Sequence, residues 1–306
     1  MNYSRSGLPQ TSAGPIRRAE PVIADPPDLG RRAVLRQRWA ELAYFHWAYE
    51  PADVQPLLPP GVRLDTFDGA AWVGLVPFVM RDVRIGATPP VPYLGTFVEV
   101  NVRTYVVDQL GRRAVWFFSL DVPRSVIVAV ARSVFALPYC WARTRFEADG
   151  PRRSYRVDRR WPHAERPSAE IDFTVGEPVA EVSELDHFLT ARWALLTKRR
   201  HRLLYGRVHH ERWPLHRVDG WRLHGDLVEA AGLPSPVGAP RAACSPGVGV
   251  TVGWLEPVPR SRGEQPLDPH ECAPADQRVG SRDPGHTEGD PATRRSERTD
   301  PVLGGR

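Results

Sequence analysis

The sequence predicts a mainly β fold of the α+β class, an antiparallel barrel or sandwich with two or three inserted helices. Three observations lead to this prediction. Many short apolar runs are separated by turn residues, one run alternates with the two-residue period of a strand, and only two segments have the pattern of a full helix. The sequence has neither a regular alternation of strands with helices nor a Gly-x-Gly-x-x-Gly motif, which argues against a dinucleotide-binding fold.

The aromatic residues define one central domain. The chain has 306 residues, of which 42% are hydrophobic, and no aromatic residue follows Trp254. Both ends are rich in proline, glycine, serine and charge, and such segments bury too little apolar surface to offset the loss of chain entropy. We therefore expect a disordered segment at residues 1–30, a single domain at 31–257 and a disordered tail at 258–306.

The first half of the domain is predicted to be mostly strands. Residues 39–47 form an aromatic run that suits a strand, and residues 51–58 suit one short helical turn. Residues 71–80 form a second strand-like run, in which Pro77 indicates an edge or a bulge. The turn at 108–112 then leads into a strand at 114–122.

The clearest periodic signal lies at residues 97–107. Alternate positions place the valines of this run on one face, and they place Phe97, Glu99, Asn101, Arg103 and Tyr105 on the other. Two arrangements fit this pattern. The polar face lines an interior site, or it is the solvated side of a sheet whose valines point inward.

The second half combines helices with hairpins. Ser125 is expected to cap a helix that runs to about residue 135, and Ser183 with Asp186 resembles a capping box for a helix to about residue 197. A short helix is expected at 226–231, ending at Gly232. The remaining strands are expected at residues 139–147, 153–161, 171–175, 205–210, 221–223 and 248–255.

Composition limits the partners. The formal net charge is +5, carried almost entirely by arginine. The arginine clusters have no accompanying nucleic-acid motif, so a solvated surface is favoured over nucleic-acid binding. The three cysteines are widely spaced, and the sequence has neither a secretory h-region nor an apolar run of membrane-spanning length. We expect a cytoplasmic protein with a small-molecule ligand, without membrane contact, and with a homo-oligomer left open.

The ordered set of motifs resembles the YqjF-like family, DUF2071, within the acetoacetate decarboxylase-like superfamily. The matching segments are LLPPG at 57–61, DGAAWV at 68–73, VPF at 76–78, FVEVNVRTY at 97–105, LPY at 137–139, HH at 209–210, WPL at 213–215 and SPGV at 245–248. The resemblance implies a cone-shaped antiparallel β-barrel with a buried cavity. It also implies that Glu99, within the segment GTFVE, lines that cavity.

The same resemblance argues against Schiff-base chemistry. The decarboxylases carry two lysines after a tyrosine-proline pair, and here Tyr139 and Cys140 stand in those positions. The only lysine of the chain is Lys198, within a charged run that suits a solvated surface. Because neither tyrosine nor arginine can form an iminium, a Schiff-base decarboxylase is excluded as the preferred function.

The candidate site is built around Glu99. We expect Glu99 to act as acid or base and Tyr139 to orient the ligand, with Arg103 holding a carboxylate. The further binding candidates are Asn101, Tyr105, Arg132 and His210. Three alternatives stay open: a structural Glu99–Arg103 ion pair, a core role for Tyr139, and packed histidines.

Metals and cofactors are not expected. His209 and His210 are adjacent, so on a strand they point to opposite faces and cannot share a metal ion. Cys140 has no placed base and is interpreted as a buried thiol. The preferred function is a small-molecule-binding barrel with lysine-independent acid–base chemistry, of lyase or isomerase type, on a small carboxylate or carbonyl compound. The alternatives are a non-catalytic ligand-binding or sensor protein and a scaffold that uses the arginine clusters.

Overall fold

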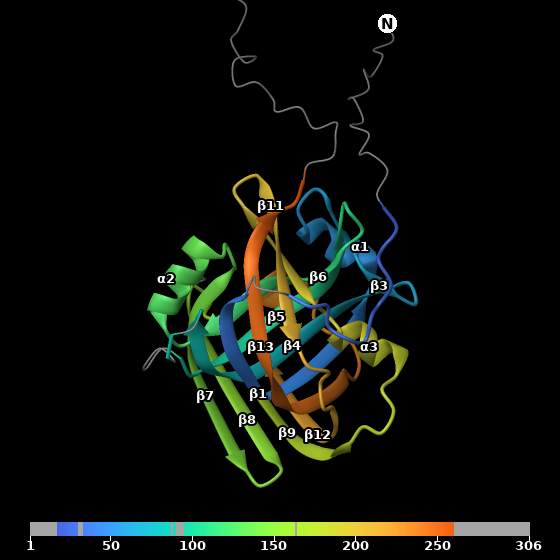
Figure 1. Ribbon diagram of the computed structural model, residues 1–306. Coiled ribbons are helices and arrows are strands. Elements are labelled where there is room, and N and C mark those ends of the chain that lie inside the picture. The colour runs from blue at the N-terminus through green and yellow to red at the C-terminus, as the bar shows by residue number, and fades with distance from the viewer. Residues whose placement is uncertain (1–16, 30–32, 87, 90–94, 163, 260–306) are drawn as a thin grey trace, which may run out of the picture. The chain divides into compact units, whose positions relative to one another are not determined.

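The computed structural model describes residues 17–29, 33–86, 88–89, 95–162 and 164–259 (Figure 1). Of these residues, 58% lie in strands and 12% in helices, which confirms the mainly β prediction. Residues 1–16 and 260–306, which include most of both expected disordered segments, lie outside the described ranges. Residues 17–29 are described, and they contact the domain through bonds such as that from Glu20 N–H to Gly111 O in the turn between β5 and β6 (2.9 Å).

The strands form one sheet whose pairings close on themselves. The thirteen strands are β1 (Ala33–Tyr49), β2 (Val62–Leu64), β3 (Thr66–Phe67), β4 (Ala70–Ile85), β5 (Phe97–Asp108), β6 (Arg113–Val122), β7 (Tyr139–Asp149), β8 (Arg152–Trp161), β9 (Ser168–Pro178), β10 (Ala194–Arg199), β11 (Arg202–His210), β12 (His216–Gly225) and β13 (Arg241–Pro257). Pairing runs from β6 through β5, β4, β1, β13, β11 and β10 back to β6, and we call these strands the cavity ring. The strands do not lie evenly around one axis.

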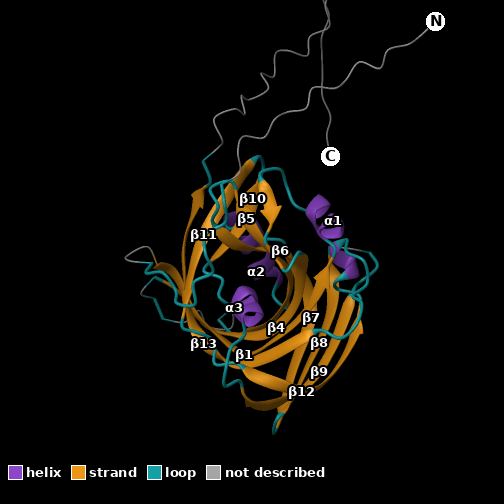
Figure 2. Ribbon diagram, turned by 90° about the vertical axis from the view of Figure 1, so that its right-hand side faces the viewer, coloured by secondary structure: helices purple, strands orange, loops and turns teal. Residues whose placement is uncertain are grey.

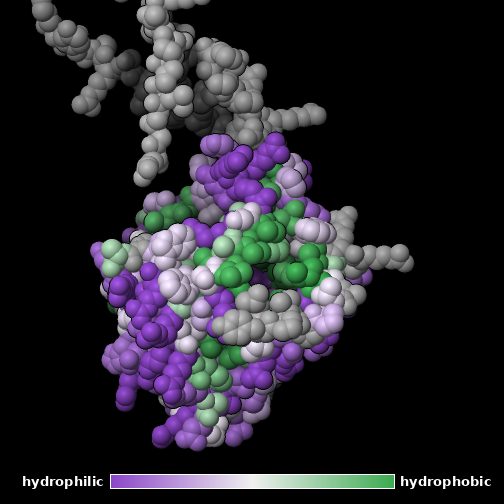
Figure 3. All heavy atoms as spheres, turned by 90° about the vertical axis from the view of Figure 1, so that its left-hand side faces the viewer, coloured by the Kyte–Doolittle hydropathy of each residue, from purple (hydrophilic) through white to green (hydrophobic). Residues whose placement is uncertain are grey.

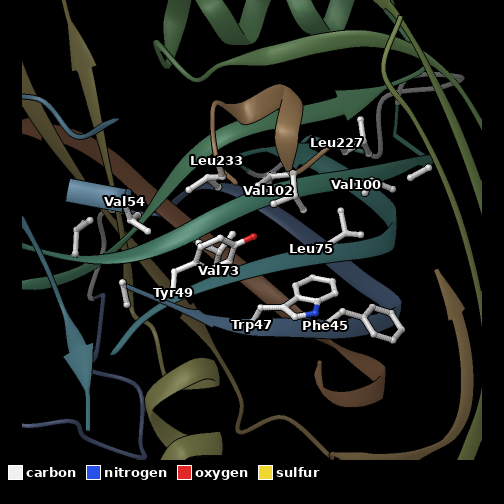
Figure 4. Close-up of a cluster of buried hydrophobic side chains, with 14 of the residues drawn as sticks. Phe45, Trp47, Tyr49, Val54, Val73, Leu75, Val100, Val102, Leu227 and Leu233 are labelled. Atoms are coloured by element: carbon white, nitrogen blue, oxygen red, sulfur yellow. The ribbon is translucent and has the colours of Figure 1, made fainter. Parts of the chain in front are cut away.

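A second circuit of pairings shares a wall with the cavity ring. It leaves β6 through β7, β8, β9 and β12 to reach β13, and it returns through β1, β4 and β5. Each strand shared by the two circuits therefore has one face toward the interior of each circuit. On β5, Val100 and Val102 pack into one core cluster with Phe45 and Leu75, as Figure 4 shows, while Glu99 lies on the opposite face. Neither face of β5 is the solvated side of a sheet.

Two helices lie at opposite ends of the cavity ring (Figures 1 and 2). Helix α2 (Ser125–Val134) connects β6 to β7, which pair in parallel and therefore need a crossover connection. Helix α3 (Glu184–Thr190) lies at the other end. The short helical segments are α1 (Pro51–Val54), η2 (Gln55–Leu57) and η3 (Glu229–Ala231), the last ending at Gly232 with φ +87° as expected.

Several expected boundaries are wrong. Ser125 is the first residue of α2, whose N-cap Arg124 makes no side-chain cap bond. Ser183 does cap α3, accepting a bond from Asp186 N–H at 3.1 Å, but this helix ends at Thr190. Residues 194–199 instead form β10, because their backbone groups pair with β11 on one side and with β6 on the other.

Pro77 lies at a bulge and not at an edge. Strand β4 has β1 on one side and β5 on the other, and the β1–β4 register shifts between Ala40 and Phe45. This irregularity spans the part of β4 that contains Pro77, whereas the β4–β5 register runs without a shift through Pro77 and Val100. Among the described residues, no helix is long and apolar enough to cross a membrane.

Candidate functional site

A cavity of about 330 Å³ lies inside the cavity ring, between α2 and α3. Most of its lining side chains are apolar and come from all seven ring strands. The lining residues with polar groups are Gln37, Trp39, Tyr44, Glu99, Arg103, Tyr139, Thr190, Arg192, His210 and Trp213. Of the seven residues expected at a site, the structure brings Glu99, Tyr139, Arg103 and His210 to this cavity.

Glu99 is 3% exposed and faces the cavity from β5. Burial raises the pKa of its carboxyl to about 8, hydrogen bonds from Tyr139 and Asn101 lower it in part, and the charge of Asp121 raises it. At pH 7 the carboxyl is therefore mostly protonated. A protonated carboxyl can donate a hydrogen bond or a proton to a ligand oxygen.

Tyr139 reaches Glu99 because of the crossover through α2. Tyr139 opens β7 opposite Leu120 of β6, and the next β6 residue, Asp121, pairs with Val100 of β5. This places the Tyr139 hydroxyl 3.1 Å from Glu99 Oε2. Burial and the nearby Glu99 raise the pKa of the phenol well above its usual value, so it remains a hydrogen-bond donor.

Arg103 is 8% exposed, and its charge is not neutralised by Glu99. Among the ion pairs of the described residues, none joins these two side chains, since residues four apart on a strand are separated by about 13 Å. Arg103 Nη2 donates a weak bond of 3.4 Å to the Tyr105 hydroxyl, and the guanidinium lies over the Tyr44 ring at 5.4 Å. Arg103 Nε has no hydrogen-bond partner in the described part of the chain.

Arg192 is a second buried guanidinium at the cavity, and the sequence analysis missed it. Its Nη1 pairs with Asp65 at 2.5 Å and its Nε donates to Phe188 O at 2.7 Å, while Nη2 finds no partner among the described residues. Burial lowers the pKa of this guanidinium, and Asp65 offsets part of that effect. Its partner Asp65 is 127 positions away in the sequence, so no local motif marks the site.

His210 lines the cavity as a neutral ring. It lies between Trp193 and Trp213, with ring centroids 4.6 Å and 4.8 Å away, and its Nδ1 is 2.7 Å from Glu211 O. Burial lowers the pKa of this imidazole to about 4. The neighbouring His209 does not line the cavity, and its Nδ1 lies 3.1 Å from Pro27 O.

The other three expected site residues lie outside the cavity lining. Asn101 is buried beside Glu99 and lowers its pKa by hydrogen bonding. Tyr105 is fully buried behind Arg103, where its hydroxyl contacts His46 Nε2 at 2.6 Å and donates to Leu189 O at 2.8 Å. Arg132 is exposed, and its Nη1 donates to the Tyr139 carbonyl at 2.7 Å. Each of these three side chains contacts a cavity residue from outside the lining. Asn101 bonds to Glu99, Tyr105 accepts from Arg103, and Arg132 donates to the Tyr139 carbonyl.

Lys198 and the two cysteines of the described residues, Cys140 and Cys244, are not among the side chains that line the cavity. Lys198 is exposed on β10 and is not among the lining residues. Cys140 is a buried free thiol, and burial raises its pKa to about 11. In the described part of the chain, no cluster of three or more His, Cys, Asp or Glu residues could hold a metal ion.

The fold is shared with acetoacetate decarboxylase-like proteins. Acetoacetate decarboxylase from Legionella pneumophila matches with a TM-score of 0.52 and 14% identity, covering 73% of this chain and 87% of that one. An acetoacetate decarboxylase-like enzyme from Sphingomonas wittichii RW1 gives 0.53 and 13%, covering 74% and 93%. The enduracididine biosynthesis enzyme MppR, solved in complex with pyruvate, gives 0.52 and 15%, covering 76% and 90%.

Sequence comparison identifies the family. The uncharacterized protein YqjF of Bacillus subtilis strain 168 is 32% identical over 208 residues, which span 68% of this chain and 85% of YqjF. Residues 36–249 match the family DUF2071, described as an uncharacterized conserved protein. The motifs that suggested this resemblance lie between residues 57 and 248, within the domain that carries the cavity. The chain therefore belongs to the DUF2071 family and has an acetoacetate decarboxylase-like fold.

Proposed function

We propose that the protein binds a small organic acid with a carbonyl group in this cavity and catalyses proton transfer on it without a lysine. The observation that carries the proposal is the pair of buried guanidiniums, Arg103 and Arg192. Both line the cavity, and each has an N–H group without a partner among the described residues. We also propose that the cavity ring corresponds to the cone-shaped barrel of the decarboxylases.

A ligand carboxylate would complete this site. A buried cation and an unpaired buried N–H each cost free energy, and an anion in hydrogen-bond reach offsets both costs. Asp65 pairs with Arg192 through Nη1 and also with Arg113, so one negative charge serves two guanidiniums, whereas Arg103 has no anionic partner in the ion pairs of the described residues. Guanidinium groups bind carboxylates through paired N–H donors, which gives the ligand one orientation.

Glu99 and Tyr139 would act on the carbonyl end of the ligand. Deprotonated Glu99 can remove a proton from the carbon beside the carbonyl, and the electron pair then moves onto the carbonyl oxygen to form an enolate. Once Glu99 has taken that proton, its carboxyl can donate to the Tyr139 oxygen, and the single Tyr139 hydroxyl proton is then available to donate to the enolate oxygen. The returned proton comes from the Glu99 carboxyl. A pKa near 8 suits a group that both gives and takes a proton near neutral pH.

The fold neighbour MppR, solved with pyruvate, supports the choice of 2-oxo acids as first probes. Pyruvate binding is measured by calorimetry, and exchange of its methyl protons in deuterium oxide is followed by proton NMR. We expect Arg103→Met to weaken binding at least tenfold. Arg145→Met, which removes a guanidinium that is 74% exposed on β7, should leave binding unchanged.

The proposed proton transfer is tested separately from ligand binding, with the variant Glu99→Gln. Glu99→Gln should retain pyruvate binding within a few fold and lose the catalysed deuterium exchange. Binding without exchange by the unmodified protein would contradict the catalytic part and favour a ligand-binding or sensor protein. Exchange that continues in Glu99→Gln would contradict the assignment of Glu99.

A further inference from the structure

We infer that the ligand is an amphiphilic acid, whose carboxylate lies at the Arg103 end of the cavity and whose apolar tail extends to the opening beside α2. This inference rests on the proposed function, because it takes the guanidiniums as the carboxylate site. It adds the class of ligand, namely a 2-oxo acid with a medium-length alkyl or aryl tail. The evidence is the order of side chains along β5, the chemistry of the rim, and the volume of the cavity.

The side chains that line the cavity from β5 follow a polarity gradient. Phe97, Glu99 and Arg103 lie on the same face of one strand, so they line the cavity in this order along β5. Arg192, which follows α3, lies with Arg103 at the polar end, because both guanidiniums lie over the Tyr105 ring, at 4.7 Å and 5.7 Å. A ligand that places its carboxylate there and its carbonyl near Glu99 has mostly apolar side chains beyond Phe97, and Gln37 of β1 is the polar exception.

The rim at the other end of the cavity is apolar and exposed. Val126 and Val130 of α2 are 57% and 51% exposed, Ile85 of β4 is 57% exposed, and all three line the cavity. Figure 3 shows hydrophobic residues gathered around a hollow on this face of the molecule. Exposed apolar side chains around a cavity are typical of a site that takes an apolar ligand, because binding removes their surface from water.

The volume is too large for pyruvate alone. An engineered apolar cavity of about 150 Å³ holds one benzene molecule, and the cavity here measures about 330 Å³. The additional space is lined by apolar side chains, of which Met80, Val83 and Leu255 are examples. A three-carbon acid would leave that surface in contact with water or empty space, whereas a tail of several carbons would fill it.

The test compares straight-chain 2-oxo acids of increasing length by calorimetry: pyruvate, 2-oxobutanoate, 2-oxohexanoate and 2-oxooctanoate. We expect affinity to rise about three- to fourfold for each methylene that enters the cavity. The ketone 2-octanone, which has a similar tail and no carboxylate, should bind at least tenfold more weakly than 2-oxooctanoate.

Two valines of α2 provide a matched pair of variants. Val130 lines the cavity, whereas Val134, one turn further on and 46% exposed, does not. Val130→Asn should weaken 2-oxooctanoate binding about three- to tenfold and leave pyruvate binding unchanged. Val134→Asn should change neither, and because both side chains are exposed, both variants should fold.

The outcomes separate this inference from the proposal on which it rests. Equal affinity for pyruvate and 2-oxooctanoate, or equal effects of the two asparagine variants, would overturn the apolar tail and leave the acid site standing. Tight binding of 2-octanone would overturn the carboxylate site and leave the apolar site. If none of the acids binds, both are overturned.

Discussion

The Tyr139 hydroxyl donates a hydrogen bond to Glu99 Oε2 over 3.1 Å, although the two residues are 40 positions apart and belong to strands that do not pair directly. Strand β6 lies between β5 and β7, and the parallel β6–β7 pairing, reached through α2, brings Tyr139 to the level of Glu99. In the family resemblance, Tyr139 stands at the position of the Schiff-base lysine. A phenol faces the buried carboxyl here, and its correspondence with the lysine position stays a prediction of the resemblance.

The first prediction concerns the pH dependence of stability. The carboxyl of Glu99 has a pKa of about 8 in the folded chain, against 4.5 for an ordinary glutamate. The folded state therefore holds a proton that the unfolded state releases between these values. The contribution of this bound proton to the free energy of unfolding is complete below pH 4.5 and is lost as pH rises through 8. The free energy of unfolding falls by up to about 1.4 kcal/mol per pH unit over this range.

Glu99→Gln removes this titration. We expect its free energy of unfolding in urea to fall less steeply than that of the unmodified protein between pH 5 and 8, so that the two curves diverge in favour of the variant as pH rises. The buried His210, with a pKa of about 4 in the folded chain, destabilises both proteins as pH falls below 6.5 and cancels in the difference. Parallel curves would show that Glu99 titrates normally.

The sequence was sufficient for the mainly β class because strand periodicity and turn residues are local properties. Residues 97–107 alternate clearly enough to assign two faces, but alternation alone cannot say whether one face is wet or both are buried. The answer depends on β1, β4 and β13 being shared between two circuits of pairings, which no local pattern encodes. The resemblance supplied the inward direction of Glu99 that the pattern left open.

The sequence analysis missed both Arg192 and strand β10 for the same reason. Arg192 follows α3 and pairs with Asp65, and β10 begins two residues later, so extending the helix to residue 197 concealed both. The helix pattern was plausible because Leu195 and Leu196 also suit a helical face. Backbone pairing with β6 and β11 decides in favour of a strand, and these partners are distant in the sequence.

The second prediction concerns the buried ion pair between Asp121 of β6 and Arg159 of β8. Two bonds of 2.7 Å connect the side chains, which are 0% and 1% exposed. Asp121→Asn leaves the guanidinium without its counter-charge in a low dielectric, and we expect a loss of about 3–5 kcal/mol in the free energy of unfolding. Urea denaturation at pH 7 measures it.

An equivalent pair at the surface is the control. Asp172 of β9 and Arg156 of β8 also form two hydrogen bonds, but their side chains are 34% and 38% exposed. Asp172→Asn should cost less than about 1 kcal/mol, because water screens the remaining charge. Similar losses in the two variants would mean that burial does not set the strength of the Asp121 pair. Replacing both Asp121 and Arg159 by leucine should cost less than Asp121→Asn alone.

The third prediction concerns Gly74, which makes room for the imidazole that supports Arg103 from behind. Gly74 pairs with His46 across β1 and β4, and a Cβ at Gly74 would lie 2.6 Å from His46 Nε2, the atom that contacts the Tyr105 hydroxyl. Gly74→Ala should therefore displace His46 and cost about 1–3 kcal/mol in urea denaturation. Gly249 of β13, where a Cβ meets nothing within 4 Å, is the control, and Gly249→Ala should be neutral or slightly stabilising. Adding His46→Ala to Gly74→Ala should recover part of the loss, since the clash then has no partner. A double variant whose loss equals the sum of the two single losses would show that the two residues do not compete for this space.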